Sequence, residues 1–451
     1  MTDFSMSRRA ALLAPAGLAL ATAHTGSKAR SPKATLAPTP PMGWNSWNSF
    51  ATTITEAQAL ENAAIMAAKL KPHGYDVFTV DIQWYEPDAK GYRYNDNPVP
   101  ALDAHGRLVP APNRFPSAAN GAGFAPLAAK IHALGLKFGV HLMRGIPRLA
   151  VERNLPVLGG GGARAGDIAD RSSICPWNPD MFGVDMSRPG AQAYYDSVFA
   201  LFASWGVDFV KMDDMSRPYD AHAPEIEAAH KAILASGRPI VLSLSPGETP
   251  VVRGPHVRRH AQMWRISDDF WDEWPMLKAQ FTRLENWSPY CGPGSWPDAD
   301  MLPLGRLSMG ERDTKFTRDE QRTLMTLWSI ARSPLIMGGD LRHLDDWTLS
   351  LLTNDDVIAV NQHSIENRPW YLADNQCVWT ACSPDRRTAY VAVFNLSDGP
   401  DAARMSVPLR RIGLAGGQLR DLWAVKELEP VTDRIEAMVA PHGAALFAVR
   451  S

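Results

Sequence analysis

The chain is poor in cysteine and has no excess of positive charge. Its 451 residues include 4 cysteines, and no two of them stand in the CxxC spacing of a zinc or redox site. The 46 Lys and Arg residues are balanced by 48 Asp and Glu residues, for a formal net charge of -2. This balance provides no basic stripe for nucleic acid and no polybasic patch for anionic lipid. The composition therefore excludes nucleic acid as a partner and favours a neutral ligand.

The few cysteines leave the disulfide pairing open. An exported chain meets an oxidising compartment, but four cysteines allow three full pairings, and buried free thiols are an equal alternative. The residues concerned are Cys175, Cys291, Cys377 and Cys382.

Long apolar runs are lacking as well. The Ala- and Leu-rich run at residues 10–23 is interrupted by Pro15 and Gly17, and it is too short to span a bilayer. Every other apolar segment of the sequence is shorter still or carries charge, so we expect no membrane partner.

The run at residues 10–23 is instead typical of a cleaved export signal. The pair Arg8-Arg9 precedes it and Ala21-Thr22-Ala23 offers small residues for cleavage, as in signals of the twin-arginine type. We expect residues 1–23 to be an export signal and residues 24–37 to be a disordered linker containing Pro, Ser and Lys. The mature protein is then periplasmic or extracellular.

Strand-like and helix-like segments alternate along most of the remaining chain. Apolar runs of strand length are separated by amphipathic stretches with apolar residues three and four apart, which is the pattern of βα units around a parallel sheet. The expected strands are 42–47, 76–82, 137–143, 209–213, 240–245, 263–268, 298–302 and 335–338. Expected helices include 56–70, 124–134, 191–205 and 320–331. This alternation predicts an α/β fold, a (β/α)8 barrel over residues 38–362.

The pattern changes after the barrel. Short apolar runs follow one another, separated by turns of Gly, Pro, Asp and Arg, and no long helical pattern remains. These features predict an antiparallel β-sandwich domain over residues 363–451.

One apolar run, at residues 207–214, ends abruptly in charge. Lys211 and Asp213 are two residues apart on an expected strand, so their side chains share a face. An ammonium beside a carboxyl group favours the ionised acid, which a covalent glycosidase nucleophile requires. A structural ion pair at a strand end is the alternative interpretation.

Other expected strands also end in polar or aromatic residues. Because the carboxyl ends of barrel strands converge on one face, we expect these side chains to gather at one site. The long connections 85–116 and 144–179 follow two of these ends, and we expect them to form the walls of a pocket. The strand-end residues are Trp44, Asp81, His141, Asp213, Ser245, Asp269 and Asp300.

Short motifs rich in Trp, Gly and Asp stand in a fixed order over residues 38–345. They include TPPMGWNSW at 39–47, KMD at 211–213, WRISDD at 264–269, GPGSW at 292–296 and DML at 300–302. In this order the motifs resemble those of the α-galactosidases of glycoside hydrolase family 27. The resemblance implies the same barrel and antiparallel β domain that the hydrophobic pattern predicts.

The resemblance also implies retaining hydrolysis by double displacement. Asp213 matches the nucleophile, and Asp269 matches the residue that protonates the leaving oxygen and then deprotonates water. Asp268 is the neighbouring rival, but strand alternation places Asp269 on the face of Arg265 and turns Asp268 away. Retaining enzymes hold the two carboxyl groups about 5 to 5.5 Å apart. This chemistry needs no cofactor and no metal, and the sequence shows no metal-ligating cluster.

Sugar-binding roles follow from the same resemblance. Trp44 matches an aromatic platform for the sugar, with a place in the core as the alternative. Asp81 and Lys211 match residues that grip ring hydroxyls through charge-assisted hydrogen bonds.

The remaining matched positions lie beside the two carboxylates. Arg265 is expected near the 2-hydroxyl and against Asp269, or in a structural ion pair. Asp300 is expected at the sugar edge or behind it. Ser245 is expected to contact a 2-hydroxyl. His141, which replaces a tyrosine that is frequent in the family, is also expected to contact the sugar.

One departure from the family pattern bears on the substrate. Members that take galactose usually carry two successive Asp residues here, whereas this chain has Asp81-Ile82. Isoleucine accepts no hydrogen bond, and a buried hydroxyl without a partner loses about 1–3 kcal/mol. L-Arabinopyranose has the ring stereochemistry of D-galactose without its hydroxymethyl group. We therefore expect an exo-acting enzyme for terminal β-L-arabinopyranosyl groups, with α-D-galactosyl groups as weaker substrates.

Two alternatives to this function remain, and both keep a carbohydrate as the ligand. A small residue at Ser245 leaves room for a 2-acetamido group, as in an α-N-acetylgalactosaminidase. A non-catalytic carbohydrate-binding barrel is the other alternative, because fold alone does not fix function.

Overall fold

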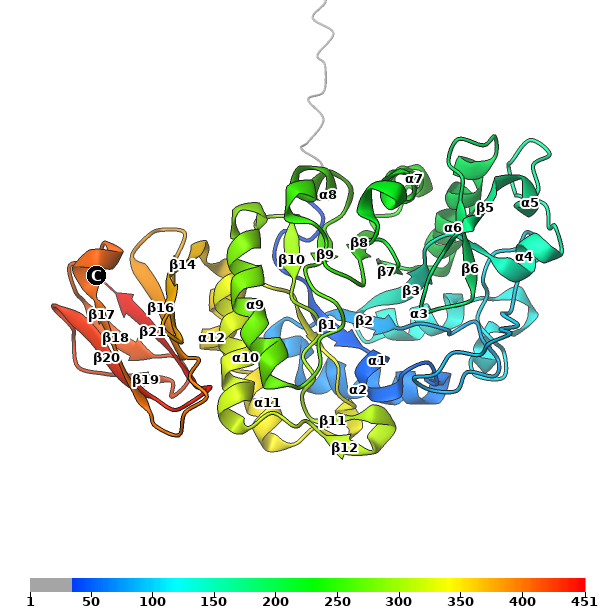
Figure 1. The fold of residues 1–451 in the computed structure, drawn as a ribbon. Helices are drawn as coiled ribbons and strands as arrows, with labels where there is room; N and C mark the ends of the chain where they lie inside the picture. The colour runs from blue at the N-terminus through cyan, green and yellow to red at the C-terminus, as the bar shows by residue number, and fades with distance from the viewer. Residues whose placement is uncertain (1–34, 451) are drawn as a thin grey trace, which may run out of the picture. The chain divides into compact units, whose positions relative to one another are not determined.

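The computed structural model describes residues 35–450, so the expected export signal and nearly all of the expected linker lie outside the described residues. Within this range, eight parallel strands form one curled sheet in the spatial order β10-β9-β8-β7-β3-β2-β1-β13 (Figure 1). The strands are β1 (Met42–Asn45), β2 (Val77–Val80), β3 (Lys137–Met143), β7 (Phe209–Asp213), β8 (Val241–Leu244), β9 (Met263–Arg265), β10 (Trp296–Asp298) and β13 (Leu335–Met337). The predicted barrel is confirmed.

The sheet closes between β10 and β13 by way of a kink. The expected strand 298–302 is wrong in its bounds, because β10 ends at Asp298 and Asp300 adopts a positive φ of 87°. After this kink, Leu302 pairs in parallel with Met337 of β13. Asp300 therefore stands at a bend between two short pairings, and its side chain is aimed by the bend rather than by strand alternation.

Helices connect the barrel strands. The longer ones are α2 (Glu56–Lys69), α3 (Ala125–Ala133), α6 (Ala191–Trp205), α7 (Tyr219–Ser236), α9 (Trp274–Trp287) and α10 (Arg318–Ala331). Shorter ones are α1 (Trp47–Phe50), α8 (Gly254–His260), α11 (Asp346–Leu352) and α12 (Asp355–His363). The helices expected at 56–70, 124–134, 191–205 and 320–331 are all present, with ends within two residues of those predicted.

Local sequence explains where two of these helices begin. Thr55 and Gln58 form a capping box at the start of α2, and Thr317 and Glu320 form one at the start of α10. In each box the threonine hydroxyl accepts a backbone N–H of the first turn, and the Gln or Glu side chain accepts the N–H of the capping residue. These bonds satisfy backbone donors that have no partner within the helix.

Residues 144–184 form a small folded insertion, so the long connection expected at 144–179 has secondary structure of its own. It carries the short helices α4 (Arg148–Glu152) and α5 (Ala165–Ile168) and a three-stranded antiparallel sheet. The sheet consists of β4 (Ile146–Pro147), β5 (Ala169–Ile174) and β6 (Met181–Val184) in the order β4-β6-β5. Its strands are short and partly polar, so the sequence pattern did not show them. A second insertion carries the two-stranded pair β11 (Arg306–Leu307) and β12 (Arg312–Asp313).

The C-terminal part is an antiparallel β-sandwich, as predicted. Apolar residues between its two sheets, among them Val391, Met405, Ile435 and Phe447, form a separate core. The larger sheet has the order β14-β15-β16-β21-β18-β19, and β17 pairs with β20. The strands are β14 (Ile365–Ala373), β15 (Gln376–Cys382), β16 (Thr388–Asn395), β17 (Ala403–Pro408), β18 (Gln418–Asp421), β19 (Lys426–Glu427), β20 (Arg434–Val439) and β21 (Ala444–Arg450).

The sandwich packs on α10 and α9. The indole N–H of Trp423 donates to Oγ1 of Thr326 at 2.8 Å, and the rings of Phe281 and Phe394 lie edge to face at 4.9 Å. Because α10 is covered by the sandwich as well as by the barrel, nearly every residue from Glu320 to Ala331 is buried.

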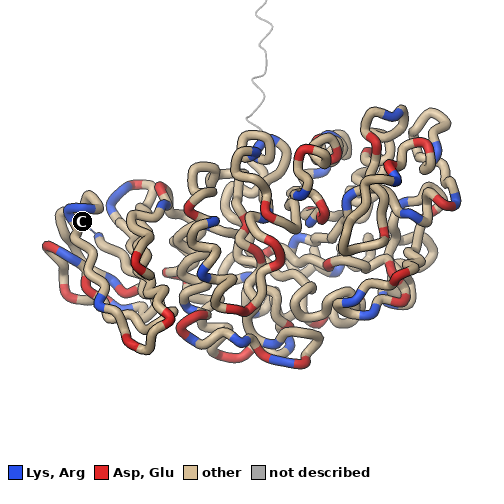
Figure 2. The backbone as a smooth tube through the Cα atoms, viewed as in Figure 1, with Lys and Arg blue, Asp and Glu red and all other residues tan. Residues whose placement is uncertain are grey.

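Surface charge and thiols agree with the composition. Figure 2 shows acidic and basic residues interspersed along the described backbone. All four cysteines are unpaired, which settles the disulfide question in favour of free thiols. Among residues 35–450, no helix combines the length and apolar character that crossing a membrane requires.

Candidate active site

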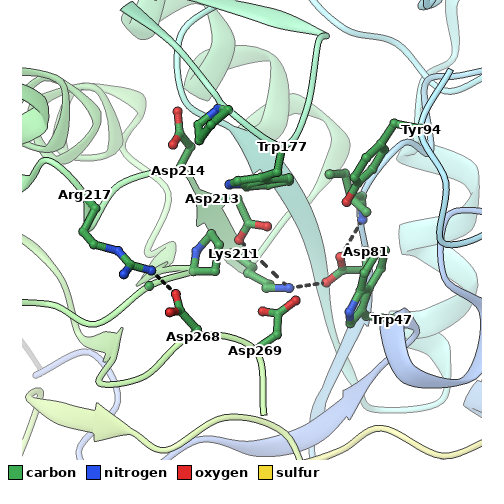
Figure 3. A pocket seen from close by; sticks show the side chains of 14 residues that line it. Trp47, Asp81, Tyr94, Trp177, Lys211, Asp213, Asp214, Arg217, Asp268 and Asp269 are labelled. Atoms are coloured by element: carbon green, nitrogen blue, oxygen red, sulfur yellow. Dashed lines mark hydrogen bonds and ion pairs between the residues drawn. The ribbon is translucent and has the colours of Figure 1, made fainter. Parts of the chain in front are cut away.

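A pocket of about 360 Å³ opens at the carboxyl ends of the barrel strands (Figure 3). It is lined by five of the residues singled out in the sequence, namely Asp81, Ile82, Lys211, Asp213 and Asp269. Below the pocket the barrel is filled by an apolar layer that includes Phe209, Met263, Trp296 and Ile336. The pocket is therefore closed at its inner end and admits a ligand from one side only.

Asp213 is the last residue of β7 and lies, more than nine-tenths buried, at the floor of the pocket. Its Oδ2 is 2.9 Å from Nε2 of His141, and its Oδ1 accepts a hydrogen bond from the Ser245 hydroxyl. The ammonium of Lys211 lies 4.0 Å from Oδ1. Burial by itself raises the pKa of Asp213, but Lys211, His141 and the hydrogen bonds outweigh burial and hold that pKa well below its usual value. Asp213 is thus ionised over the whole neutral range.

Lys211 connects the carboxylates of the pocket. Its Nζ lies 2.9 Å from Oδ2 of Asp81, which also accepts a hydrogen bond of 2.7 Å from the Asn45 amide. In Figure 3 the carboxylates of Asp81, Asp213 and Asp269 gather around the ammonium. Although burial opposes the charge, these acids raise the pKa of Lys211 above its usual value. Lys211 is a permanent cation that offers its remaining donors to the pocket.

The two candidates for the acid/base role both line the pocket. The sequence argument from strand alternation was wrong in its premise, because β9 ends at Arg265 and residues 266–269 are not in a strand. Asp268 is exposed and forms an ion pair with Arg217, whereas Asp269 lies 3.3 Å from Nη1 of Arg265. Asp268 therefore points to Arg217 at the rim, whereas the carboxyl group of Asp269 lies beside Lys211 together with those of Asp81 and Asp213 (Figure 3).

Arg265 and Asp300 form a buried pair behind Asp269. Nη2 of Arg265 lies 2.8 Å from Oδ2 of Asp300, and both side chains are almost inaccessible. The backbone N–H of Phe270, next to Asp269 in sequence, also donates to Asp300 at 2.7 Å. Neither Arg265 nor Asp300 lines the pocket. Arg265 contacts Asp269, as expected, and also forms the structural pair with Asp300. This pair fixes the segment that carries Asp269.

The assignment of Trp44 as the sugar platform is wrong. Its side chain is 0% exposed, stacks on Phe78 at 4.7 Å and donates its indole N–H to the Gly339 carbonyl at 2.7 Å. Side chains alternate along β1, so Trp44 faces the surrounding helices while Asn45 faces the barrel interior. In this motif, the indole that lines the pocket is that of Trp47, three residues after Trp44.

Ser245 and His141 contact the nucleophile instead of the pocket. Both were expected to meet the sugar, yet Ser245 is 1% exposed, His141 is 0% exposed, and neither lines the pocket. Their partner is Asp213. The expectation was wrong because strand alternation tells which face a residue occupies but not how deep in the barrel it lies.

The long connections do form pocket walls, as expected. Tyr94 comes from the connection after β2 and Trp177 from the folded insertion, and their rings lie 5.9 Å apart at the rim. Asp180 ties the two walls together, because it accepts hydrogen bonds from the Tyr85 hydroxyl at 2.6 Å and the Gln83 amide at 3.1 Å. The sequence analysis named neither Tyr94 nor Trp177. An aromatic residue within an otherwise polar loop was the signal that could have found them.

Two further pocket residues, Asp214 and Arg217, come shortly after Asp213 in the sequence. Asp214 adopts a positive φ of 63° and is held by Arg144, whose Nη2 lies 2.8 Å from Oδ2. Arg217 lies at the rim, where it neutralises Asp268. The bend at Asp214 turns the chain away at the end of β7 and leaves the Asp213 side chain pointing inward. The sequence showed no metal-ligating cluster, but within residues 35–450 the fold brings Glu227, His256 and His260 together between α7 and α8, outside this pocket.

Glycoside hydrolases act with two carboxyl groups that flank a sugar. The pocket of this protein holds two such groups, one of them buried and ionised, between aromatic walls at the open end of a (β/α)8 barrel, where barrel enzymes have their active sites. These features indicate a glycoside hydrolase. The comparisons agree. Residues 182–363 match the family described as α-galactosidase A, and residues 373–449 match the α-galactosidase C-terminal β-sandwich domain. The chain belongs to glycoside hydrolase family 27, as the motifs in its sequence indicated.

Individual relatives cover almost the whole chain. An α-galactosidase from Coffea arabica is 30% identical over 418 residues, which are 91% of this chain and 93% of the relative. A family 27 β-L-arabinopyranosidase from Geobacillus stearothermophilus, known as a crystal structure, is 48% identical with a TM-score of 0.90. That alignment covers 92% of this chain and 97% of the Geobacillus enzyme. A variant of the Geobacillus enzyme has also been crystallised in complex with arabinose.

Proposed function

We propose that this protein is a retaining exo-glycosidase that removes terminal β-L-arabinopyranosyl residues and acts more slowly on terminal α-D-galactopyranosyl residues. The observation that carries the proposal is Ile82, an apolar side chain that lines the pocket next to Asp81. The backbone N–H of Ile82 donates to Oδ1 of Asp81 at 2.7 Å. The apolar side chain is therefore fixed beside the carboxylate that we expect to grip the sugar.

In the first step of the proposed reaction, the Asp213 carboxylate attacks the anomeric carbon. The bond from that carbon to the aglycone oxygen breaks, and Asp269 donates its proton to the departing oxygen. The product of this step is a glycosyl ester of Asp213. Lys211 and His141 keep Asp213 ionised before the attack, as described above.

In the second step, Asp269 acts as a base. It takes a proton from a water molecule, whose oxygen attacks the anomeric carbon, and the bond to Asp213 breaks with return of the carboxylate. The sugar is released with its original anomeric configuration. Arg265 lies 3.3 Å from Oδ1 of Asp269 and steadies that carboxyl group in both roles.

Exo action is supported by the closed inner end of the pocket. The apolar layer of the barrel interior leaves no passage for a chain to continue beyond the nucleophile. A sugar that reaches Asp213 must then be the last residue of its chain. The rim aromatics Tyr94 and Trp177 stand where the rest of the substrate would lie.

The preference for arabinopyranosyl groups is supported by the chemistry of Ile82. A galactosyl hydroxymethyl group placed against this side chain loses a hydrogen bond, at a cost of about 1–3 kcal/mol. L-Arabinopyranose has only hydrogen at that position, so an apolar neighbour is no disadvantage. The relative at 48% identity is a β-L-arabinopyranosidase, which supports the same assignment. Ser245 does not line the pocket, so it no longer supports the α-N-acetylgalactosaminidase alternative, which now rests on the likeness to a Bacillus halodurans protein of that description at 46% identity.

The test compares hydrolysis of p-nitrophenyl β-L-arabinopyranoside and p-nitrophenyl α-D-galactopyranoside by the purified protein. We expect the ratio of kcat/KM to favour the arabinoside. Ile82→Asn and Ile82→Asp should lower this ratio by about 5- to 100-fold, the range that corresponds to one hydrogen bond. Ile82→Asn is needed beside Ile82→Asp because a new carboxylate next to Asp81 also brings charge repulsion.

Ile82→Val is the matched control, since it keeps an apolar branched side chain and should leave the ratio unchanged. The proposed preference is wrong if the parent favours the galactoside, or if the Asn, Asp and Val variants share one ratio. Asp213→Ala separates the enzyme from a sugar-binding barrel. A variant that hydrolyses either substrate as fast as the parent contradicts the role of Asp213.

A further inference from the structure

A second cluster of reactive side chains lies outside the pocket, between helices α7 and α8. Glu227 belongs to α7, and His256 and His260 stand one turn apart on α8. One potential ligand atom from each of the three residues lies within 4.8 Å of the other two. None of the three lines the pocket, so the hydrolysis of glycosides does not explain why they meet.

The distances suit a small metal ion. Nε2 of His256 lies 3.3 Å from Oε1 of Glu227, and two ligands of a tetrahedral ion bound at about 2.0–2.1 Å are about 3.3 Å apart. The rings of His256 and His260 lie side by side, with centroids 4.4 Å apart and planes inclined by 40°. The three ligand atoms lie within 4.8 Å of one another, so binding of one ion requires the side chains to rotate toward a common centre.

The other nitrogen of each imidazole already has a partner. Nδ1 of His256 lies 2.9 Å from the Tyr219 hydroxyl, and Nδ1 of His260 lies 2.9 Å from the His256 backbone carbonyl. A proton held on Nδ1 leaves the lone pair on Nε2, which is the arrangement that metal-binding histidines show. The contact to the carbonyl fixes this tautomer for His260, since a carbonyl oxygen only accepts.

Solvent can reach the cluster. The three residues are each partly buried, with side chains of His256 and Glu227 that are 24% and 42% exposed. An ion can therefore enter from solvent and keep a water molecule as its fourth ligand. The second oxygen of Glu227 lies 3.9 Å from the ammonium of Lys231, which leaves Oε1 for the ion.

We propose that Glu227, His256 and His260 form a binding site for Zn²⁺ or a closely related transition-metal ion, which joins α7 to α8. Two imidazoles and one carboxylate form a donor set that favours zinc, nickel or copper over the hard cations Mg²⁺ and Ca²⁺. The two helices follow β7 and β8, and they lie side by side in Figure 1. A metal bound there stabilises this part of the barrel wall without entering the pocket.

The test is calorimetric titration of the untagged protein with ZnCl2, after treatment with EDTA and its removal. We expect one tight site per chain and no comparable binding of MgCl2. His256→Gln and His260→Gln should each weaken Zn²⁺ binding at least 10-fold. Tyr219→Phe should weaken it by about 10- to 100-fold, the usual effect of removing a group that orients a ligand.

His363→Gln is the matched control, because His363 is an exposed histidine at the end of α12, outside the cluster. This variant should bind Zn²⁺ as tightly as the parent. Melting temperature gives a second readout, and Zn²⁺ should raise it in the parent and the control but not in His256→Gln. Should either histidine variant fail to fold in EDTA, Glu227→Gln removes a ligand at a half-exposed position and tests the same site. The proposal is overturned if the variants of the cluster bind Zn²⁺ as tightly as the parent.

Discussion

The Nε2 atom of His141 lies 2.9 Å from Oδ2 of Asp213, at a depth in the barrel where the two side chains are 0% and 8% exposed. With Lys211 and the Ser245 hydroxyl, this imidazole completes the set of groups that surround the nucleophile. The protein thus stabilises the negative charge of Asp213 before any sugar arrives. In the proposed reaction we therefore expect His141 and Ser245 to act through Asp213, as positioning residues.

His141→Phe should lower kcat/KM on aryl glycosides by about 10- to 100-fold, because a buried carboxylate that loses one polar partner loses about 1–3 kcal/mol. His141→Tyr should retain more activity than His141→Phe, since its hydroxyl can donate to the carboxylate. The two substitutions have the same ring and differ by that hydroxyl. Steady-state kinetics measures the difference, and equal losses in both variants contradict a polar role for His141.

Lys211→Met should shift the acid limb of the kcat/KM profile to higher pH. Burial raises the pKa of Asp213, and Lys211 is the strongest of the groups that lower it. Without the ammonium the pKa rises, and because only the ionised carboxylate attacks the sugar, activity is lost at a higher pH than in the parent. The measurement is kcat/KM between about pH 3 and pH 8.

The control for this substitution is Lys426→Met, on an exposed strand of the sandwich. It should leave the whole profile in place. A Lys211→Met profile that falls in height but keeps its acid limb would show that Lys211 binds the substrate without affecting Asp213.

Asp269→Ala should have an effect that depends on the leaving group. Loss of a general acid lowers the rate about 10²- to 10⁴-fold for an aglycone that must be protonated as it leaves. A dinitrophenyl group leaves without a proton, so its rate should fall much less. Azide should restore turnover of dinitrophenyl substrates by attacking the glycosyl-enzyme in place of activated water. Asp268→Ala, one residue away, should lower kcat/KM by similar, small factors for both kinds of substrate. The reverse pattern would assign the acid/base role to Asp268.

Trp44→Ala and Trp47→Ala should separate folding from binding. Trp44 is fully buried against Phe78, so its truncation should cost about 3–5 kcal/mol of unfolding free energy. Trp47 lines the pocket, so its truncation should raise KM with a smaller loss of stability. Denaturant unfolding and steady-state kinetics on the same two variants measure both quantities. A raised KM in Trp44→Ala with unchanged stability would restore Trp44 as the sugar platform.

Much of the barrel could be predicted because each strand ends where polar residues begin. The strands at 137–143 and 209–213 coincide with β3 and β7, since their apolar runs are bounded by charge on both sides. Spacing on β7 also placed Lys211 and Asp213 on one face, and the structure brings both to the pocket. Residues that are close in sequence and on one regular element are the ones whose relative placement the sequence determines.

The failures have a common physical origin in depth and in irregular backbone. Ser245 lies too deep for contact with the pocket, because its height depends on the stagger between neighbouring strands, which alternation does not encode. Asp269 and Asp300 lie where the strands have ended and local bends direct the side chains. The partners His256 and Glu227 come from different helices, so only the His256-to-His260 spacing of one turn hinted at their cluster.

In the proposed mechanism, the contacts around Asp213 also affect the lifetime of the covalent intermediate. Once Asp213 has become an ester it carries no charge, and the nearby ammonium of Lys211 faces a neutral group where it faced an anion. Expelling the sugar restores that attraction, so the same surroundings that weaken Asp213 as a base speed its departure. In the proposed reaction we therefore expect the contacts around Asp213 to favour breakdown of the ester.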